Sequence, residues 1–126
     1  GLVILLGVQI DDIENDADFL VNKISGLRVF SDENDKMNLS IKDVGGSALV
    51  ISQFTLCSDT KKGRRPSFIK AAPPEDGNRL YEYFMSEMKK EGVPVQSGEF
   101  AAMMDVELVN DGPVTFVMDS KNKPNV

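Results

Sequence analysis

The sequence contains no histidine, no tryptophan and a single cysteine. Without histidine, Ser-His-Asp and Cys-His catalytic arrangements are excluded within this chain, as is a zinc site that uses histidine. The lone Cys57 cannot form an internal disulfide. The longest apolar run, LVILLGV at the start of the chain, is too short to span a bilayer. We therefore expect a cytoplasmic protein without membrane association.

Acidic residues outnumber basic ones, and the net charge of −6 argues against general binding to nucleic acid. The basic residues are nevertheless concentrated. Residues 61–74 contain five basic and no acidic side chains, whereas the remaining chain has nine basic and twenty acidic. Such a stretch is either a solvated loop or a phosphate contact site. Its basic residues are Lys61, Lys62, Arg64, Arg65 and Lys70.

A chain of 126 residues with 41% hydrophobic side chains is long enough for one core, so residues 1–126 are interpreted as a single domain with a tail at 120–126. The run 2–8 predicts a strand buried on both faces, and 47–56 predicts a second strong strand. Because the chain begins at Gly1, directly in a strand and without Met, we expect that N-terminal sequence is missing.

Apolar residues at helical spacing predict two amphipathic helices, at 11–27 and 73–92. The apolar face of the second helix, which we expect in the core, consists of Leu80, Tyr81, Phe84, Met85 and Met88. In the first, Asp11 or Asp12 is the expected N-cap. The residues after the second helix predict three further strands separated by turns. Two helices segregated from five to seven strands indicate an α+β fold with a largely antiparallel, curved, barrel-like sheet.

Two stretches place small polar side chains in apolar surroundings: SQFTL at 52–56 and NDGPVTF at 110–116. A Ser or Thr hydroxyl is a poor nucleophile without an adjacent base, and SQFTL contains no base. Backbone N–H groups at a strand end can instead stabilise an oxyanion. If the substrate carried a hydroxyl beside the scissile ester, as the ribose 2′-OH of an aminoacyl-tRNA does, positioning alone could contribute about 7–11 kcal/mol.

SQFTL, KKGRRPSF and NDGPVTF, in this order, resemble the D-aminoacyl-tRNA deacylases, which hydrolyse D-amino acids from tRNA. The resemblance covers essentially the whole chain and includes LLGV, DKMNLS, AAPPE and YEYF. It implies a hydrolase without metal or cofactor that acts on D-aminoacyl-tRNA. Members of this family begin with a further pair of strands, about 25 residues with their turn, which this sequence lacks.

The resemblance also implies a homodimer with active sites at the interface. In it, Gly112 and Pro113 of one subunit, joined by a cis peptide, enter the site of the other as a chiral gate. The remaining implied roles are pocket lining and catalysis for Ser52, Gln53, Phe54 and Thr55, loop support for Asn110 and Thr115, and tRNA binding for Lys61, Lys62, Arg64, Arg65, Phe68 and Met104. Phe68 and Met104 match positions near the terminal adenosine.

Several alternatives stay open at the level of sequence. Thr55 is the nucleophile in one view of the family, and the tRNA 2′-OH carries the proton in the other, which the absence of histidine favours. A homologous editing domain with a different amino-acid preference, or one that also accepts glycine, would show similar motifs. A non-catalytic RNA-binding module would not need the polar strand end or the Gly-Pro pair, and would usually interleave aromatic with basic residues.

Overall fold

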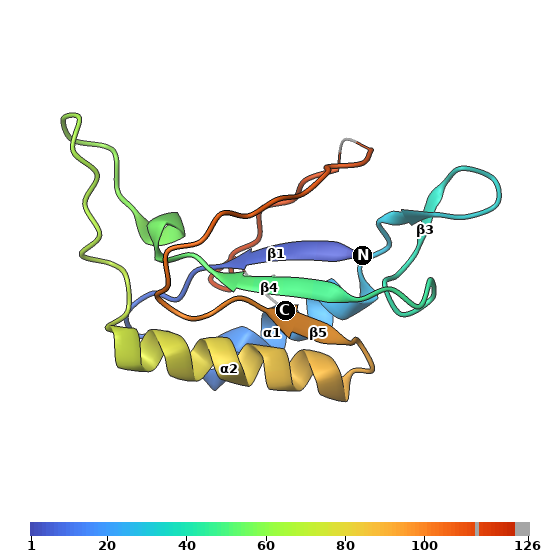
Figure 1. The fold of residues 1–126 in the computed structure, drawn as a ribbon, viewed down its shortest axis with the longest axis horizontal. Helices are drawn as coiled ribbons and strands as arrows, with labels where there is room; N and C mark the ends of the chain where they lie inside the picture. Colours follow the sequence, from blue (N-terminus) through green and yellow to red (C-terminus); the bar gives the residue numbers. More distant parts are fainter. Residues whose placement is uncertain (113, 123–126) are drawn as a thin grey trace.

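The computed structural model describes residues 1–112 and 114–122. Its elements, in chain order, are β1 (Leu2–Leu6), α1 (Glu14–Gly26), β2 (Phe30–Ser31), β3 (Met37–Leu39), β4 (Ala48–Ser52), the 3₁₀ helix η1 (Phe54–Cys57), α2 (Pro74–Lys90) and β5 (Val95–Ser97). Both helices lie below the sheet formed by β1, β4 and β5 (Figure 1). The architecture is therefore α+β, as expected.

The three-stranded sheet has the order β1-β4-β5 and is parallel throughout. Its register pairs Leu2 with Ala48 and Ala48 with Val95. Parallel strands need a long crossover, usually through a helix, and here α1 precedes β4 while α2 precedes β5. Antiparallel pairing occurs between β2 and β3. The prediction of a largely antiparallel sheet was therefore wrong, and the sheet is not closed into a barrel.

The segment after β5 departs furthest from expectation. Residues 102–112 and 114–119, here called the C-terminal arm, form neither helix nor strand where they are described, although their sequence alternates like strands. Figure 1 shows the arm running out above β1 and returning. Apolar alternation predicts a strand only where a neighbour supplies backbone hydrogen-bond partners. The arm has no such neighbour among the described residues, so the strands predicted there are absent.

The helices agree with the sequence pattern, and only their boundaries differ. Helix α1 begins after Ile13, and neither Asp11 nor Asp12 caps it. Instead Ile13 N donates to Asp16 Oδ2 at 2.9 Å. Helix α2 buries the face predicted for it, where the side chains are at most 6% exposed. This face consists of Leu80, Tyr81, Phe84, Met85 and Met88.

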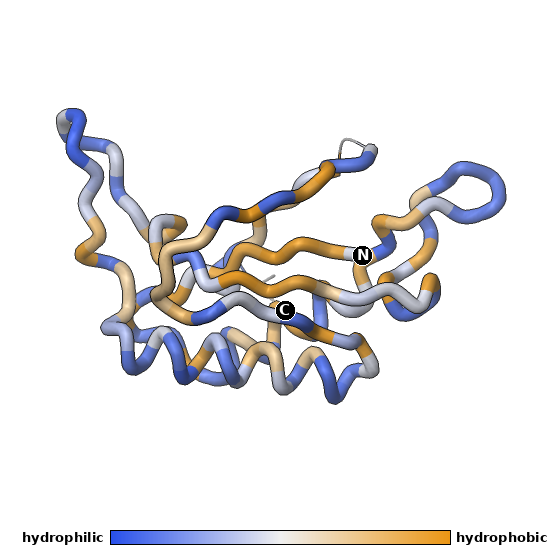
Figure 2. Tube along the Cα trace, viewed as in Figure 1, coloured by the Kyte–Doolittle hydropathy of each residue, from blue (hydrophilic) through white to orange (hydrophobic). Residues whose placement is uncertain are grey.

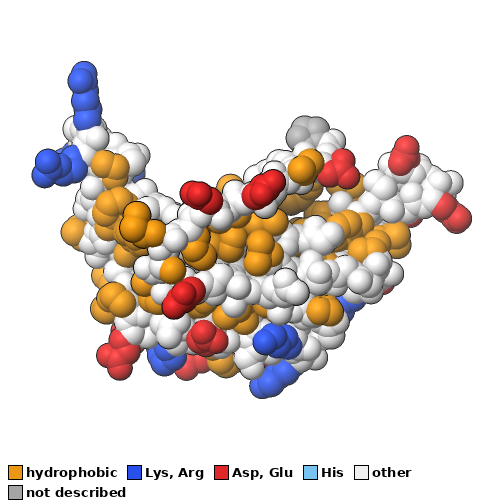
Figure 3. All heavy atoms as spheres, in the orientation of Figure 1, with side chains coloured by type: hydrophobic (Ala, Val, Ile, Leu, Met, Phe, Trp, Pro, Cys, Tyr) orange, Lys and Arg blue, Asp and Glu red, His pale blue; other side chains and the backbone are white. Residues whose placement is uncertain are grey.

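The core lies between the helices and one face of the sheet. Leu6 and Val50 are buried there, and the hydroxyl of Tyr81 donates to Val50 O at 2.9 Å. The opposite face of β1 is open, with Val3 42% and Leu5 46% exposed. The prediction that this strand is buried on both faces was therefore wrong. In Figure 2 strands β1 and β4 are largely hydrophobic and the tips of the long loops hydrophilic. Figure 3 shows hydrophobic side chains gathered between the arm and the sheet.

Candidate active site

The SQFTL segment lies at the end of β4, as the sequence predicted, but the strand predicted over 47–56 stops at Ser52 and the 3₁₀ helix η1 follows from Phe54. Ser52 is the last residue of β4, and the backbone N–H of Gln53 donates to Leu6 O at 2.8 Å, which fixes the segment to the end of β1. The first intrahelical bond of η1 runs from Leu56 N to Gln53 O at 3.2 Å. The N–H groups of Phe54 and Thr55 precede this bond, so they have no acceptor within the helix.

The side chains of Gln53 and Thr55 are joined directly. Gln53 Nε2 donates to Thr55 Oγ1 at 2.6 Å, and both side chains are accessible to solvent. Because the amide occupies an acceptor position of the hydroxyl, it orients the threonine without taking its proton. A carboxamide is not a base. This geometry therefore holds the hydroxyl in place but does not activate it as a nucleophile.

Gly7, which follows β1, lies directly against η1. The sequence analysis did not identify this role. A Cβ at this position would lie 3.0 Å from Leu56 Cβ, 3.2 Å from Cys57 Sγ and 3.3 Å from Gln53 O. These distances are shorter than ordinary contacts, so β1 and η1 can approach this closely only because residue 7 has no side chain. A glycine directly after a strand is the sequence signal for such an approach.

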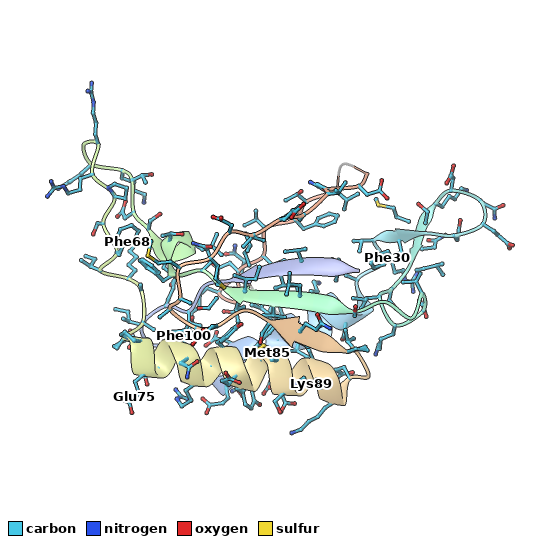
Figure 4. The ribbon with its side chains drawn as sticks, viewed as in Figure 1. Phe30, Phe68, Glu75, Met85, Lys89 and Phe100 are labelled. Atoms are coloured by element: carbon cyan, nitrogen blue, oxygen red, sulfur yellow. The ribbon has the colours of Figure 1, made fainter. Side chains whose placement is uncertain are left out.

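Phe54 and Phe68 meet beside this segment, with ring centroids 5.2 Å apart and an interplanar angle of 67°. Their exposed fractions are 56% and 39%, which is high for an aromatic pair. Figure 4 shows Phe68 next to η1, at the base of the loop that extends away from the body. Two residues predicted to belong to the site are thus in contact, although fourteen positions separate them.

The basic residues occupy the far end of this loop. Asp59 and Ser67 exchange backbone hydrogen bonds of 2.7 and 2.9 Å, which closes the loop at its base. The turn at its tip uses Gly63, with φ of 65°. The four basic residues that surround this turn, Lys61, Lys62, Arg64 and Arg65, are exposed. Figure 3 shows Lys and Arg side chains projecting from this end of the molecule.

The described residues of the NDGPVTF stretch, 110–112 and 114–116, lie at the tip of the C-terminal arm. Asn110 Nδ2 donates to Thr115 Oγ1 at 2.9 Å, so the two predicted support residues close the loop across its base. Gly112 has φ of 138°, a backbone conformation that side chains disfavour. Pro113, and with it the predicted cis peptide, lies outside the described residues.

Within one chain the two halves of the predicted site are apart. Figure 1 shows the arm tip at the opposite end of the sheet from η1. Met104 lies at the root of the arm, where its Sδ atom occupies the space that a Cβ at residue 98 would need, so Gly98 leaves room for it. The structure thus brings Gln53 to Thr55, Phe54 to Phe68 and Asn110 to Thr115, but it does not bring Gly112 to the SQFTL segment of the same chain.

Cys57 is buried beneath this site and is 5% exposed. Burial raises the pKa of its thiol, and the negative charges of Asp12 and Asp119 raise it further. A thiol of this kind is a poor nucleophile.

Among the residues that the structure describes, no group of three or more His, Cys, Asp or Glu side chains is arranged to hold a metal. No helix in the described part of the chain is long and apolar enough to cross a membrane.

Comparison with known proteins identifies the family. The model of the family D-Tyr-tRNA(Tyr) deacylase matches residues 1–119. A protein named D-aminoacyl-tRNA deacylase from Koribacter versatilis is 57% identical over 123 residues, which are 98% of this chain and 83% of that one. One from Clostridioides difficile is 58% identical over 120 residues, 95% of this chain and 80% of the relative.

Two solved structures share the fold. The structure titled c-Myc DNA Unwinding Element Binding Protein superposes with a TM-score of 0.81 and 36% identity, over 89% of this chain and 76% of that one. A probable eukaryotic D-amino acid tRNA deacylase has a TM-score of 0.63 at 17% identity, over 81% and 75% of the two chains, and shows likeness of fold alone. On the match to residues 1–119 and these identities, this chain belongs to the D-Tyr-tRNA(Tyr) deacylase family.

Proposed function

We propose that this chain removes D-amino acids from D-aminoacyl-tRNA by hydrolysing the ester bond, and that it does so in the cytoplasm. Membership of the deacylase family over residues 1–119 is the observation that carries this proposal. The chain is a hydrolase acting on an ester whose alcohol is the terminal ribose of tRNA. Editing of a different amino acid, glycine included, is the alternative that substrate comparison decides.

The chemistry is assigned to the backbone at the start of η1. The N–H groups of Phe54 and Thr55 stabilise the oxyanion that forms when water attacks the ester carbonyl, and Ser52 and Gln53 line the pocket beside them. Thr55 is held by Gln53 and has no basic partner in that contact, so the ribose 2′-OH of the substrate relays the proton. The 2′-OH of the bound substrate thereby supplies the acid–base group that the protein lacks.

The first experiment compares two losses under single-turnover conditions. D-tyrosyl-tRNA with a 2′-deoxy terminal ribose should be hydrolysed at least about 100-fold more slowly than the normal substrate, the scale of a missing acid–base group. Thr55→Ala on the normal substrate should be slowed less, because this variant keeps the backbone N–H groups. Equal rates on both termini, together with an inactive Thr55→Ala enzyme, would restore threonine as the nucleophile.

Selection between enantiomers is assigned to the arm tip of a second copy. D and L side chains have equal volume, so discrimination needs a rigid group in the space that one of them requires. Gly112 permits close approach and Pro113 restricts φ, while the bond between Asn110 and Thr115 supports the loop. The arm tip lies away from η1 of its own chain, which supports a gate that acts in a homodimer (Figure 1).

Gly112→Ala and Pro113→Ala are expected to reduce discrimination between D- and L-tyrosyl-tRNA without unfolding the protein. Sedimentation should give a dimer. Mixed dimers test the assignment in trans: a chain with Gly112→Ala, combined with a chain carrying Phe54→Pro, which removes one of the two proposed oxyanion donors and so slows its own site strongly, should contain one active site with both native elements. If heterodimers discriminated no better than expected from a gate within each chain, the gate would not act on the partner.

tRNA is proposed to approach along the basic loop. Its four exposed basic residues contact backbone phosphates, and Phe68 and Met104 lie near the terminal adenosine. Phe68 is well placed for this role because its ring contacts Phe54 of the pocket segment. The acidic surface elsewhere repels the remaining phosphates and restricts tRNA to this side.

A further inference from the structure

The basic loop lies between Asp59 and Ser67, whose backbone hydrogen bonds close it at its base. The carboxylate of Asp59 also accepts a hydrogen bond from Lys61 N at 2.9 Å, which fixes the start of the first leg. Phe68 follows the closing pair directly, and its ring contacts that of Phe54 at a centroid distance of 5.2 Å. The base of the loop is therefore beside the place where the proposed function puts the terminal adenosine.

The chain that leaves the loop is attached to the body as well. Ile10 N donates to Lys70 O, and Ala72 N donates to Val8 O, both at 2.9 Å. These bonds connect the end of the loop to the segment that follows β1. Figure 1 shows the loop reaching out beyond the helices and the sheet from this attachment. The fold thus determines where the loop begins relative to η1.

The four basic side chains near the tip form two tiers. Counted outward from the closing pair, Lys61 and Arg65 are each two positions along their legs. Lys62 and Arg64 are each three positions along, and Gly63 makes the turn between them. Two positions of extended chain span at most about 7 Å, and three span at most about 11 Å. These lengths limit how far each tier lies from the base of the loop.

The side chains of both tiers are available to a ligand. All four are exposed. Within residues 1–112 and 114–122, none of the four forms an ion pair with a carboxylate. Lys and Arg side chains in this state bind phosphate groups, and the counterions released from the nucleic acid favour the contact.

The reach of the loop matches the unpaired end of tRNA. Stacked nucleotides of one strand advance by about 3.4 Å each, so the two tiers lie at most about two and about three nucleotides from the base of the loop. The terminal adenosine occupies that base in the proposed function. The unpaired strand at the 3′ end of tRNA, which ends in CCA, extends over this distance, and the base-paired acceptor stem begins beyond it.

The charge of the remaining chain disfavours contact with the acceptor stem. Outside residues 61–74 the chain carries nine basic and twenty acidic side chains. A duplex carries about one phosphate charge per 1.7 Å of its axis, about twice the density of one strand. The acidic body therefore repels the paired stem more strongly than it repels the unpaired end.

We propose that the basic loop binds the phosphates of the unpaired 3′ strand of tRNA and makes no contact with the base-paired acceptor stem. This inference rests on the proposed function and names the part of the substrate that the loop recognises. Phosphate contacts fix the position of a strand and carry no sequence information directly. A short single strand that ends in the D-tyrosyl ester is therefore a complete ligand for the loop.

The test compares three D-tyrosyl esters, which are full tRNA, a hairpin with the acceptor stem and the unpaired end, and the unpaired end alone as a short oligonucleotide. The loop variant replaces Lys61, Lys62, Arg64 and Arg65 by Gln. The matched control is Lys89→Gln combined with Lys90→Gln, which removes exposed positive charge from the last turn of α2. Figure 4 shows Lys89 at the end of α2 that lies away from Phe68. The measurement is kcat/KM at several salt concentrations, normalised to folded protein.

We expect the loop variant to lose the same factor in kcat/KM on all three esters. Four phosphates neutralised on a single strand give a slope of about −2.8 in log affinity against log salt, so the advantage of the wild type should shrink by up to about 50-fold between about 50 and 200 mM salt. The loss should be absent with D-tyrosyl-adenosine, which has no phosphate to contact. The control variant should follow the wild type on every ester.

Two results would overturn the inference. A loss that appears on tRNA and on the hairpin but is smaller on the short strand would show that the loop contacts the acceptor stem. A loop variant that matches the wild type on all three esters would show that the loop does not bind the substrate. If the loop variant folds poorly, Lys62→Gln with Arg64→Gln leaves the residues nearest the closing pair intact and should give about half the change in slope.

The wild-type rates separate this inference from the proposed function. If the wild-type protein releases D-tyrosine from none of the three esters, the proposed function fails and the inference fails with it. If it hydrolyses the tRNA ester but not the short single strand, the proposed function stands and the inference is overturned. Hydrolysis of all three esters by the wild type, with an equal loss in the loop variant, is the result that the inference requires.

Discussion

Gly7→Ala probes the contact between β1 and the candidate active site. The added methyl group would lie 3.0 Å from Leu56 Cβ and 3.3 Å from Gln53 O. Carbon atoms pack best at about 3.5–4.0 Å, so η1 must move away by about half an ångström. Neither neighbouring atom is the end of a flexible side chain, and rotation of a side chain cannot relieve the contact. The movement therefore falls on the backbone that carries the N–H groups of Phe54 and Thr55.

The cost to stability follows from two opposing effects. Adding a methyl group to a packed site costs about 1–3 kcal/mol, while replacing glycine by alanine restricts the unfolded chain and returns about 0.4–1 kcal/mol. We expect a net loss of about 1–2 kcal/mol in the free energy of unfolding. The rate of hydrolysis per folded molecule should fall by about tenfold or more, because small displacements of oxyanion donors weaken catalysis strongly. Removing one donor costs about 100-fold.

The assay combines urea unfolding with single-turnover hydrolysis of D-tyrosyl-tRNA, normalised to folded protein. Gly26→Ala is the matched control, because a Cβ at Gly26 meets nothing within 4 Å. Since Gly26 ends α1, alanine there should stabilise the protein by at most about 1 kcal/mol and leave the rate unchanged. Wild-type activity and stability in Gly7→Ala would show that the close approach of β1 does not position η1.

Replacing Lys61, Lys62, Arg64 and Arg65 by Gln should weaken tRNA binding and reduce the slope of log affinity against log salt by about 0.7–0.9 for each phosphate that the loop no longer neutralises; an unchanged slope would place tRNA elsewhere. Cys57 should react slowly with a thiol reagent in the native protein and rapidly in urea, because burial raises its pKa; fast native labelling would contradict this. The hydrogen bond to Asp18 raises the pKa of Tyr83 from 10.0 to about 12. The stabilising contribution of this hydrogen bond is therefore complete below pH 10.0 and is lost as pH rises through about 12. Burial also raises the pKa of Tyr81. Phenolate absorbance should therefore remain low at pH 10.0. If Tyr81 and Tyr83 were each half-ionised at that pH, both assignments would be refuted. The pKa of Asp16 is lowered from 3.8, so its contribution is present above that value and is lost as pH falls through the lowered pKa; Asp16→Asn should have its smallest effect on urea stability in strong acid.

The sequence by itself determined the features that depend on neighbouring residues. The buried face of α2 follows from helical spacing within a short window, which is why Tyr81 and Phe84 were predicted to be in the core. The position of SQFTL at a strand end and the basic loop after it were also readable, since turn residues and charges are local. The resemblance that identified the family rested on these same segments.

The tertiary structure decided what depends on distant partners. Strand direction depends on which strands become neighbours, and the helix before β4 and the helix before β5 make this sheet parallel. The arm alternates like a strand, yet its described residues lack a backbone partner. The close approach at Gly7 exists only once the chain has folded. The same holds for the hydrogen bond from Lys121 Nζ to Asp16 Oδ1, which joins residues 105 positions apart. The spacing of apolar residues shows which face of a helix or strand is apolar. Which other element packs against that face depends on the whole fold.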